Sequence, residues 1–167
     1  MCLNLINFEK MNNIRTKNAK KVVATISLLL LVTVSALCLT GMTPASDSII
    51  GKWEAVDKGY IWEFSKSGDT YIAKILYNKE ALEADGKTYK KDVHNTDPTL
   101  QNRSIQGIIF ITDLKYDDGT YVDGKIYSFL DGGFYDCKAT VEGDQLHLRA
   151  YQGIAAFGKT LELIRVK

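Results

Sequence analysis

The chain has 167 residues, of which 25% are charged and 46% are hydrophobic, with 21 lysines and arginines against 20 aspartates and glutamates. A balance this close to neutral, without a basic block in the part expected to fold, excludes nucleic acid as a partner, because nucleic-acid binding depends on neutralising phosphates. The length allows one domain of ordinary size once a targeting segment is removed.

Residues 1–45 have the pattern of a secretory signal peptide. A basic segment over 17–21 precedes an apolar run over 22–39, and small residues follow it up to Ala45. We predict cleavage after Ala45, which leaves a single β-barrel domain over 46–167. The protein is then exported to the periplasm or to the outside of the cell.

Two alternatives would keep the protein at a membrane. The apolar run is about 18 residues long, at the short edge of the length that spans a bilayer, so an uncleaved anchor stays open. Lipidation at Cys38 is the other alternative, although Leu37 stands where such signals have Gly, Ala or Ser. The start of translation is open between Met1 and Met11. We predict no membrane span in the mature chain.

The mature domain differs from the full chain in charge and in cysteines. The leader holds five of the bases and one of the acids, so 16 bases and 19 acids remain, a net charge of −3. Cys137 is the one cysteine outside the leader, which rules out an internal disulfide. The alternation of its strand turns Cys137 inward, and we predict a buried, inert thiol.

Period-two alternation between Gly/Asp-rich turns predicts eight strands. The short links between the last four favour antiparallel neighbours. One or two helical turns are predicted over 79–84, inside a long loop from Asn78 to Gly107. In chain order the strands cover 49–56, 60–64, 70–77, 108–115, 120–127, 134–141, 145–151 and 159–166.

The predicted fold class is all-β: an eight-stranded up-and-down antiparallel barrel with one long loop carrying a short helix. Eight antiparallel strands can close on themselves and so remove exposed edges; a two-sheet sandwich is the alternative. Gly51 and Trp53 on the first strand and Arg165 on the last favour the barrel. An arginine stacked on the indole would close one end, with a cation–π contact of ~0.5–2 kcal/mol.

A Gly-x-Trp on the first strand with an arginine late on the last resembles the lipocalin-like (calycin) barrels. From about Ile50 to Val166 the chain also resembles a secreted bacterial family, domain of unknown function 2147. The most specific shared motif is D-x-x-N-x-D-P-x-L-x-x-R-x-x-x-G, in the long loop. The matching residues are Gly51 and Trp53; Asp92, Asn95, Asp97, Pro98, Leu100, Arg103 and Gly107; Gly124, Ile126 and Tyr127; Tyr151, Gly153 and Gly158; and Arg165 and Val166.

The chain departs from the family pattern in three places, one of them two residues long. Ser104 and Ser128-Phe129 stand where the family tends to have proline, and Tyr121 stands where it tends to have tryptophan. The resemblance implies a lipocalin-like barrel outside the cytoplasm. It implies no known reaction and no assigned catalytic residues.

The polar residues of the long loop allow two interpretations each. Asp92, Asn95 and Asp97 place three side-chain oxygens within six residues, a spacing that suits Ca²⁺ but is equally typical of Asx-turns, which we favour. Arg103 either grips an anionic ligand or pairs with Asp92 or Asp97 to hold the loop, which we also favour. The two histidines of the chain lack a third zinc ligand, so we predict no metal and no cofactor.

The aromatic residues are the stronger functional indication. The chain has nine Tyr, six Phe and two Trp, and all but Phe8 lie in the mature domain. Aromatics that point into an eight-stranded barrel either fill its core or line a cavity for one small ligand.

The leading hypothesis is an exported, lipocalin-like binding module for a small apolar or amphipathic ligand, with the long loop as a lid. The alternative is an envelope protein-interaction module with a filled core and the 78–107 loop as its contact surface. An enzyme is the third hypothesis, although no nucleophile–base pair is visible; its site would be Asp92, Asn95 and Arg103. The candidate ligand-binding residues are Arg103, Asp92, Asn95, Asp97, Tyr127, Tyr135 and Tyr151.

Overall fold

The structure, a computed structural model, describes residues 45–167. The predicted leader, with its apolar run and Cys38, lies outside the described residues, so cleavage, anchoring and lipidation stay predictions.

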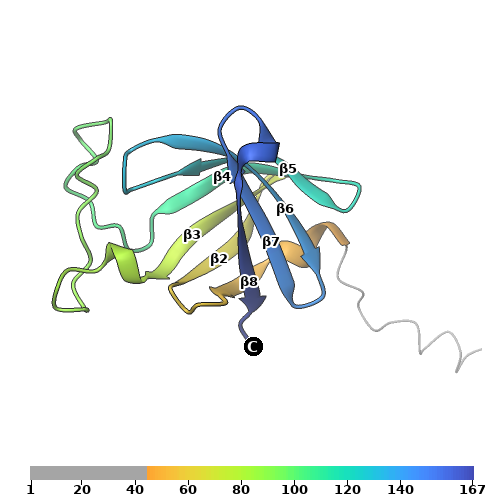
Figure 1. Ribbon diagram of the computed structural model, residues 1–167, viewed down its shortest axis with the longest axis horizontal. Coiled ribbons are helices and arrows are strands. Elements are labelled where there is room, and N and C mark those ends of the chain that lie inside the picture. Colours follow the sequence, from red (N-terminus) through yellow and green to blue (C-terminus); the bar gives the residue numbers. More distant parts are fainter. Residues whose placement is uncertain (1–44) are drawn as a thin grey trace, which may run out of the picture. The chain divides into compact units, whose positions relative to one another are not determined.

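Eight strands and three short 3₁₀ helices make up the described chain (Figure 1). All eight predicted strands are present. The strands are β1 (Gly51–Ala55), β2 (Tyr60–Ser67), β3 (Thr70–Asn78), β4 (Ile109–Asp117), β5 (Thr120–Tyr127), β6 (Phe134–Glu142), β7 (Gln145–Tyr151) and β8 (Lys159–Arg165). The helices are η2 (Ala45–Ile49), η3 (Lys79–Ala81) and η4 (Ala155–Phe157).

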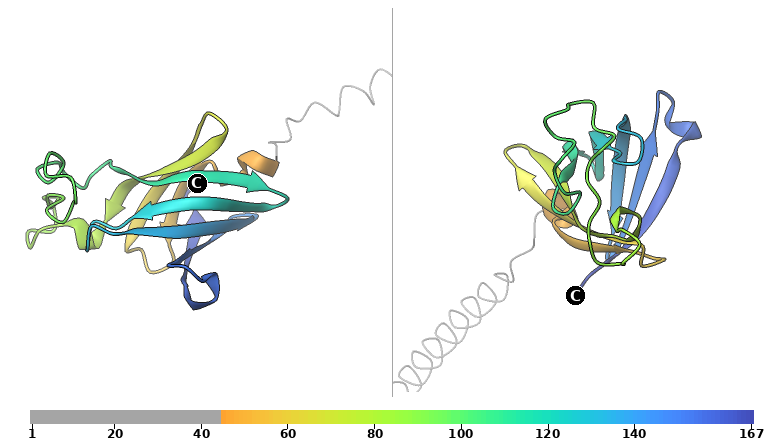
Figure 2. Two further views of the ribbon diagram at one scale, coloured as in Figure 1. Left: turned by 90° about the horizontal axis from the view of Figure 1, so that it is seen from above. Right: turned by 90° about the vertical axis from the view of Figure 1, so that its left-hand side faces the viewer.

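The strands form one closed barrel in sequence order. Each strand pairs antiparallel with the next, and β1 pairs with β8 through the partners Trp53–Arg165, Glu54–Ile164 and Ala55–Leu163. The right-hand view of Figure 2 shows the barrel from the side of the long loop. The predicted barrel is therefore confirmed and the alternative of a two-sheet sandwich is wrong.

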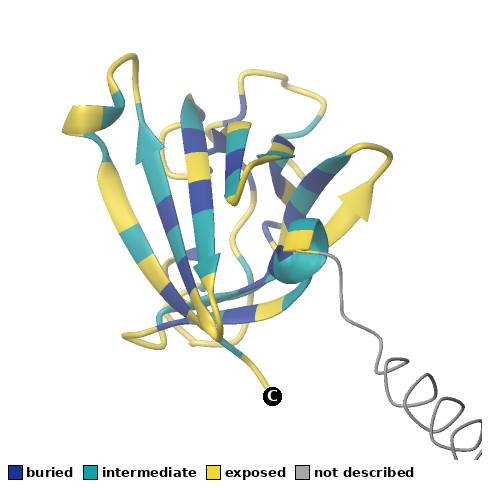
Figure 3. Cartoon of the chain, turned by 90° about the vertical axis from the view of Figure 1, so that its right-hand side faces the viewer, coloured by how far each residue is buried: buried dark blue, intermediate teal, exposed yellow. Residues whose placement is uncertain are grey.

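Side chains alternate between the barrel interior and the outside, as the sequence pattern requires. In β8, for example, Leu163 is buried while its neighbour Ile164 is exposed, and Figure 3 shows such bands along the strands. Partners in the antiparallel ladder share a face, so Trp62 of β2, which pairs with the buried Trp53 of β1, also points inward.

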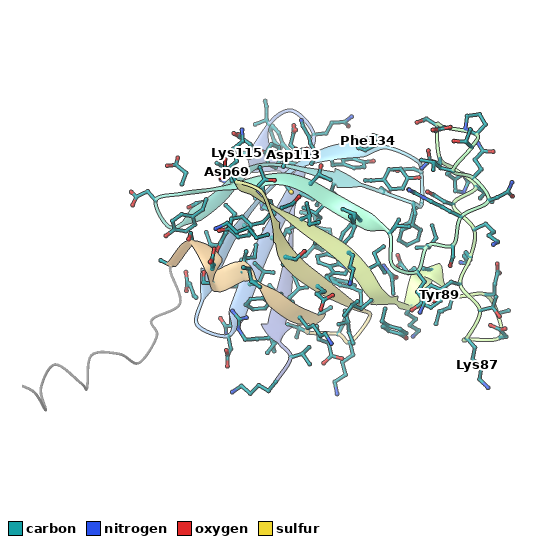
Figure 4. All side chains as sticks on the ribbon, turned by 180° about the vertical axis from the view of Figure 1, so that it is seen from behind. Asp69, Lys87, Tyr89, Asp113, Lys115 and Phe134 are labelled. Atoms are coloured by element: carbon teal, nitrogen blue, oxygen red, sulfur yellow. The ribbon has the colours of Figure 1, made fainter. Side chains whose placement is uncertain are left out.

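The two ends of the barrel differ. We call the end where β1, β3, β5 and β7 finish the open end, and the other the closed end. The long loop leaves from the open end, whereas η2 and the tight β2–β3 turn lie at the closed end, as Figures 1 and 2 show. Figure 4 likewise shows Asp69, in that turn, far from Lys87 in the long loop.

Arg165 closes the barrel at its closed end. Its guanidinium lies 4.1 Å from the centre of the Trp53 ring. It also donates hydrogen bonds from Nη1 to the Ile50 carbonyl (2.9 Å) and from Nη2 to the Ser48 carbonyl (2.5 Å). The Trp53 indole N–H donates to the Ile49 carbonyl at 2.7 Å. The first and last strands are thus joined to η2 as well as to each other.

The sequence pattern missed η2. Ile49 was predicted to begin the first strand, but it ends η2 and is completely buried. Its backbone N–H donates to the Tyr121 hydroxyl at 3.0 Å, and that hydroxyl donates to the Ser46 carbonyl at 2.7 Å. Because these partners lie more than 70 positions apart, no local pattern reveals them.

Several boundaries also moved, most by one or two residues. The helical turn predicted over 79–84 ends at Ala81, because the chain then pairs Leu82 with Tyr89 in an isolated bridge. Strand β2 continues to Ser67, where the sequence predicted a turn from Ser65 onward.

A cavity at the open end and a clasp on the long loop

A cavity of about 1010 Å³ opens at the open end of the barrel. Its inner wall is apolar and comes from four different strands. Trp62, Ile75, Phe110 and Ile126 line it and are all buried. At this end the inward side chains line a pocket, while those toward the closed end, such as Trp53 and Tyr121, are packed in the core.

The rim of the cavity is both apolar and charged. Val56, Leu130 and Phe157 line it while remaining largely exposed, Phe157 at 86%. Five charged residues share the rim without a clear excess of either sign: Asp57, Glu80, Glu162, Lys79 and Lys159. The buried polar residues of the described chain are Asp92 and Asn95, and neither lines the cavity.

A stack of aromatic rings forms one wall. The Tyr60 and Trp62 rings are 4.4 Å apart with planes at 18°, and the Phe110 ring lies 4.8 Å from Trp62. Burial, followed by the charges of Asp57 and Glu80, raises the pKa of Tyr60 to about 12. The Tyr60 hydroxyl therefore stays protonated at physiological pH.

Three candidate ligand residues line the cavity: Tyr127, Tyr135 and Tyr151. The Tyr135 hydroxyl donates to Asp131 at 2.6 Å, and the Tyr127 hydroxyl turns outward to the long loop. Sequence reasoning did not select Tyr60, Trp62 or Phe110. The available signal was the alternation of large aromatics in β2, which placed Tyr60 and Trp62 on one face without showing that space lay beside them.

The other four candidates lie outside the cavity, in the long loop. Asp92 has a completely buried side chain. Its Oδ2 accepts hydrogen bonds from Arg103 Nε (2.9 Å) and Asn95 Nδ2 (2.9 Å), and its Oδ1 accepts one from the Tyr127 hydroxyl (2.6 Å). Arg103 Nη2 adds an ion pair to Oδ2 at 2.9 Å. We call Asp92, Asn95, Arg103 and Tyr127 the Asp92 clasp.

The clasp holds the long loop against the end of β5. The Arg103 guanidinium also lies 5.8 Å from the Tyr127 ring centre. Burial, reinforced by the hydrogen bond to Asp92, raises the pKa of Tyr127 to about 12, so Tyr127 remains the donor. Arg103 therefore pairs with Asp92 to hold the loop, the interpretation that the sequence favoured, and no oxygen of Asp92 is left exposed for a substrate.

The Asx-turn interpretation is confirmed for Asn95 and Asp97 and is wrong for Asp92, whose carboxylate accepts from side chains only. Asn95 Oδ1 accepts the backbone N–H of Asp97, and Asp97 Oδ1 accepts the backbone N–H and the hydroxyl of Thr99. These hydrogen bonds from Thr99 lower the pKa of Asp97. The three oxygens predicted as a Ca²⁺ alternative thus face different partners. Within residues 45–167 no three His, Cys, Asp or Glu side chains are grouped to hold a metal ion.

The long loop lies beside the cavity and does not cover it. Of residues 78–107, only the first three, Asn78, Lys79 and Glu80, line the cavity. Farther along, it packs on the β5–β6 connection: a Cβ at Gly132, where φ is +73°, would collide with the His94 carbonyl oxygen. The loop does not cover the cavity here, and its role as a lid stays a prediction. The loop supports the rim from outside.

Cys137 should resist thiol reagents in the folded protein. Its side chain is completely buried and burial raises its pKa to about 12, so thiolate is nearly absent at pH 8. We expect no labelling of Cys137 by an aromatic disulfide reagent until denaturant is added. Mass spectrometry of the labelled peptides identifies Cys137 separately from the cysteines of the leader. Rapid labelling under native conditions would contradict the burial.

Among the residues that the structure describes, no helix is both long enough and apolar enough to cross a bilayer.

Comparison with known proteins agrees with this geometry. The sequence model of a family described as "Uncharacterized protein conserved in bacteria (DUF2147)" matches residues 51–165. A solved structure, described as protein HP1028 from the human pathogen Helicobacter pylori, which belongs to the lipocalin family, is similar with a TM-score of 0.61 and 26% sequence identity. The match covers 71% of this chain and 83% of that one. No curated protein matches the chain.

Proposed function

Because the chain belongs to the DUF2147 family of uncharacterised bacterial proteins and has a lipocalin-like barrel, we propose that it binds a small, mainly apolar or amphipathic ligand in the cavity at its open end. The proposal includes export of the protein, so that binding takes place outside the cytoplasm.

The cavity is the observation that carries this proposal. A volume of about 1010 Å³ is at the upper end of the size typical of small-molecule sites, roughly 300–1,000 Å³. Its inner wall is formed by buried apolar and aromatic side chains, while charges are confined to the rim. An apolar body therefore fits the interior, and a polar group on the ligand fits at the mouth, where solvent and charged side chains both lie.

Filling the cavity should abolish binding. Leu161 of β8 lines the cavity, and Leu161→Trp places a much larger side chain there. We expect at least a tenfold loss of affinity for N-phenyl-1-naphthylamine, a neutral apolar fluorophore whose emission rises on leaving water. Fluorescence titration of the purified protein measures the change, and native mass spectrometry of the protein purified from its host detects a retained natural ligand.

Ile164→Trp is the matched control. Ile164 lies on the same strand but on the outer face, 49% exposed, so the same substitution should leave affinity unchanged. Saturable binding that survives Leu161→Trp would place the ligand elsewhere. The absence of binding to the wild-type protein in both measurements would reject the proposed function.

A further inference from the structure

One buried donor in the barrel has no acceptor. Within residues 45–167 the Trp62 indole nitrogen, Nε1, is the buried side-chain nitrogen or oxygen that makes no hydrogen bond. The side chain is 5% exposed. Leaving such a group unsatisfied forfeits its hydrogen bond to water without replacement, and native proteins rarely do so without a reason.

The rest of the barrel interior shows how unusual this is. The other tryptophan, Trp53, donates its indole N–H to the Ile49 carbonyl at 2.7 Å. The buried hydroxyls of Tyr121 and Tyr127 both donate to oxygens, on Ser46 and Asp92. The fold therefore supplies partners to buried donors wherever the core is closed. Trp62 differs in lining the cavity.

The surroundings of Trp62 offer it no acceptor. Its neighbours are the rings of Tyr60, stacked at 4.4 Å, and Phe110, tilted at 4.8 Å. Beside them, Ile75 and Ile126 complete the apolar wall. If this position served packing alone, phenylalanine would fill it without burying a donor.

We propose that Trp62 is a specificity-determining residue of the cavity, and that the ligand carries a carbonyl, ether or hydroxyl oxygen on its apolar body that accepts the Trp62 indole N–H. This inference rests on the proposed function, because it names the ligand class of the same cavity. A neutral oxygen suits the position, since no charged side chain is buried in the cavity to accompany a deeply placed charge.

Access to the nitrogen requires a small movement. Nε1 is covered by its neighbours, so an oxygen reaches it only when an aromatic side chain shifts. Tyr60, which stacks on Trp62 and is only partly buried, is the neighbour freest to move. Ligand entry would then displace the Tyr60 ring and replace its contact with the hydrogen bond.

A pair of ligands with one shape tests the inference. 2-Acetylnaphthalene carries a carbonyl oxygen where 2-ethylnaphthalene has a methylene group. The chain has two tryptophans, so its ¹H–¹⁵N spectrum carries two indole signals. The signal that disappears in Trp62→Phe belongs to Trp62. We expect the acetyl compound to move the Trp62 signal downfield and to leave that of Trp53, which already has its acceptor, in place. The ethyl compound should give no comparable downfield shift.

Affinity gives the second measurement. We compare the dissociation constant of the acetyl compound with that of the ethyl compound in each protein. In Trp62→Phe the preference for the acetyl compound should be about tenfold smaller than in the wild-type protein, an effect of about 1.4 kcal/mol. Using the ratio removes the difference in water solubility and any loss of packing that both ligands share. Binding of both compounds with similar Trp62 shifts and an unchanged ratio would overturn the inference and leave the proposed function standing. Binding of neither compound would overturn the inference, and the proposed function would fall with it where the fluorophore titration and native mass spectrometry also show no binding.

Discussion

Replacing Arg103 with methionine should lower the free energy of unfolding by about 3 kcal/mol, at the lower end of the 3–5 kcal/mol typical of breaking a buried ion pair. Asp92 would keep its hydrogen bonds from Tyr127 and Asn95 but would lose both contacts to the guanidinium. Arg103 is itself 34% exposed, which moderates the loss. Chemical denaturation measures the change, and the melting temperature should fall by roughly 10 °C.

The damage should begin in the long loop. Because the Asp92 clasp ties the long loop to the end of β5 and does not join β1 to β8, hydrogen exchange should accelerate over residues 79–108 before it accelerates in β1 and β8. Lys115→Met is a matched control that breaks the exposed pair of Lys115 with Asp123. We expect that change to stay within about 0.5 kcal/mol of wild type. Equal losses in the two variants, or no loss in Arg103→Met, would show that the clasp does not hold the loop.

The Asp92 clasp was only partly predictable from the sequence of the long loop. A loop of this length in a small domain must be tied down, so a pairing of Arg103 with an aspartate of the same loop was predictable. The choice of Asp92 over Asp97 was not. Tyr127, from β5, fixes it by donating to Asp92, whereas Asp97 is engaged by Thr99. That contact links positions 35 residues apart, which spacing alone does not show.

The cavity shows a different limit. Alternation in β2 predicts that Tyr60 and Trp62 share a face, and the closed barrel turns the face of Trp62 inward. Whether inward side chains leave room depends on how residues from opposite strands meet, here Trp62 with Phe110 of β4. The sequence does not show how side chains pack across the barrel. That packing decides whether a barrel of this kind has a cavity or a filled interior.

Barrel closure, by contrast, was predictable from Gly51, Trp53 and Arg165, because strand order alone brings the first and last strands together once the ring closes. The Arg165 guanidinium then stacks on the Trp53 ring and donates to the carbonyls of Ile50 and Ser48. The role of η2, whose Ser48 carbonyl accepts from Arg165, was not predictable, because residues 45–49 show no strand or helix period of useful length.

Arg165→Met should therefore destabilise the barrel by about 3 kcal/mol. The variant loses a cation–π contact of ~0.5–2 kcal/mol and two charge-assisted hydrogen bonds of ~1.5–3 kcal/mol each, and part of this is recovered when water reaches the freed carbonyls. Arg165→Lys keeps the charge but cannot reach both carbonyls from one planar group, so we expect about half the loss. Urea denaturation of the three proteins gives the order directly.

The same substitution should leave the cavity almost unaffected, because Trp53 and Arg165 are not among the residues that line it and η2 lies at the opposite end of the barrel. At a temperature where both proteins are folded, the fluorophore affinity of Arg165→Met should stay within about twofold of wild type, while backbone amides of 45–50 exchange faster. A large loss of affinity in a folded Arg165→Met protein would mean that the two ends are coupled through the strands. The barrel would then open and close as one unit, and closure at one end would set the size of the cavity at the other.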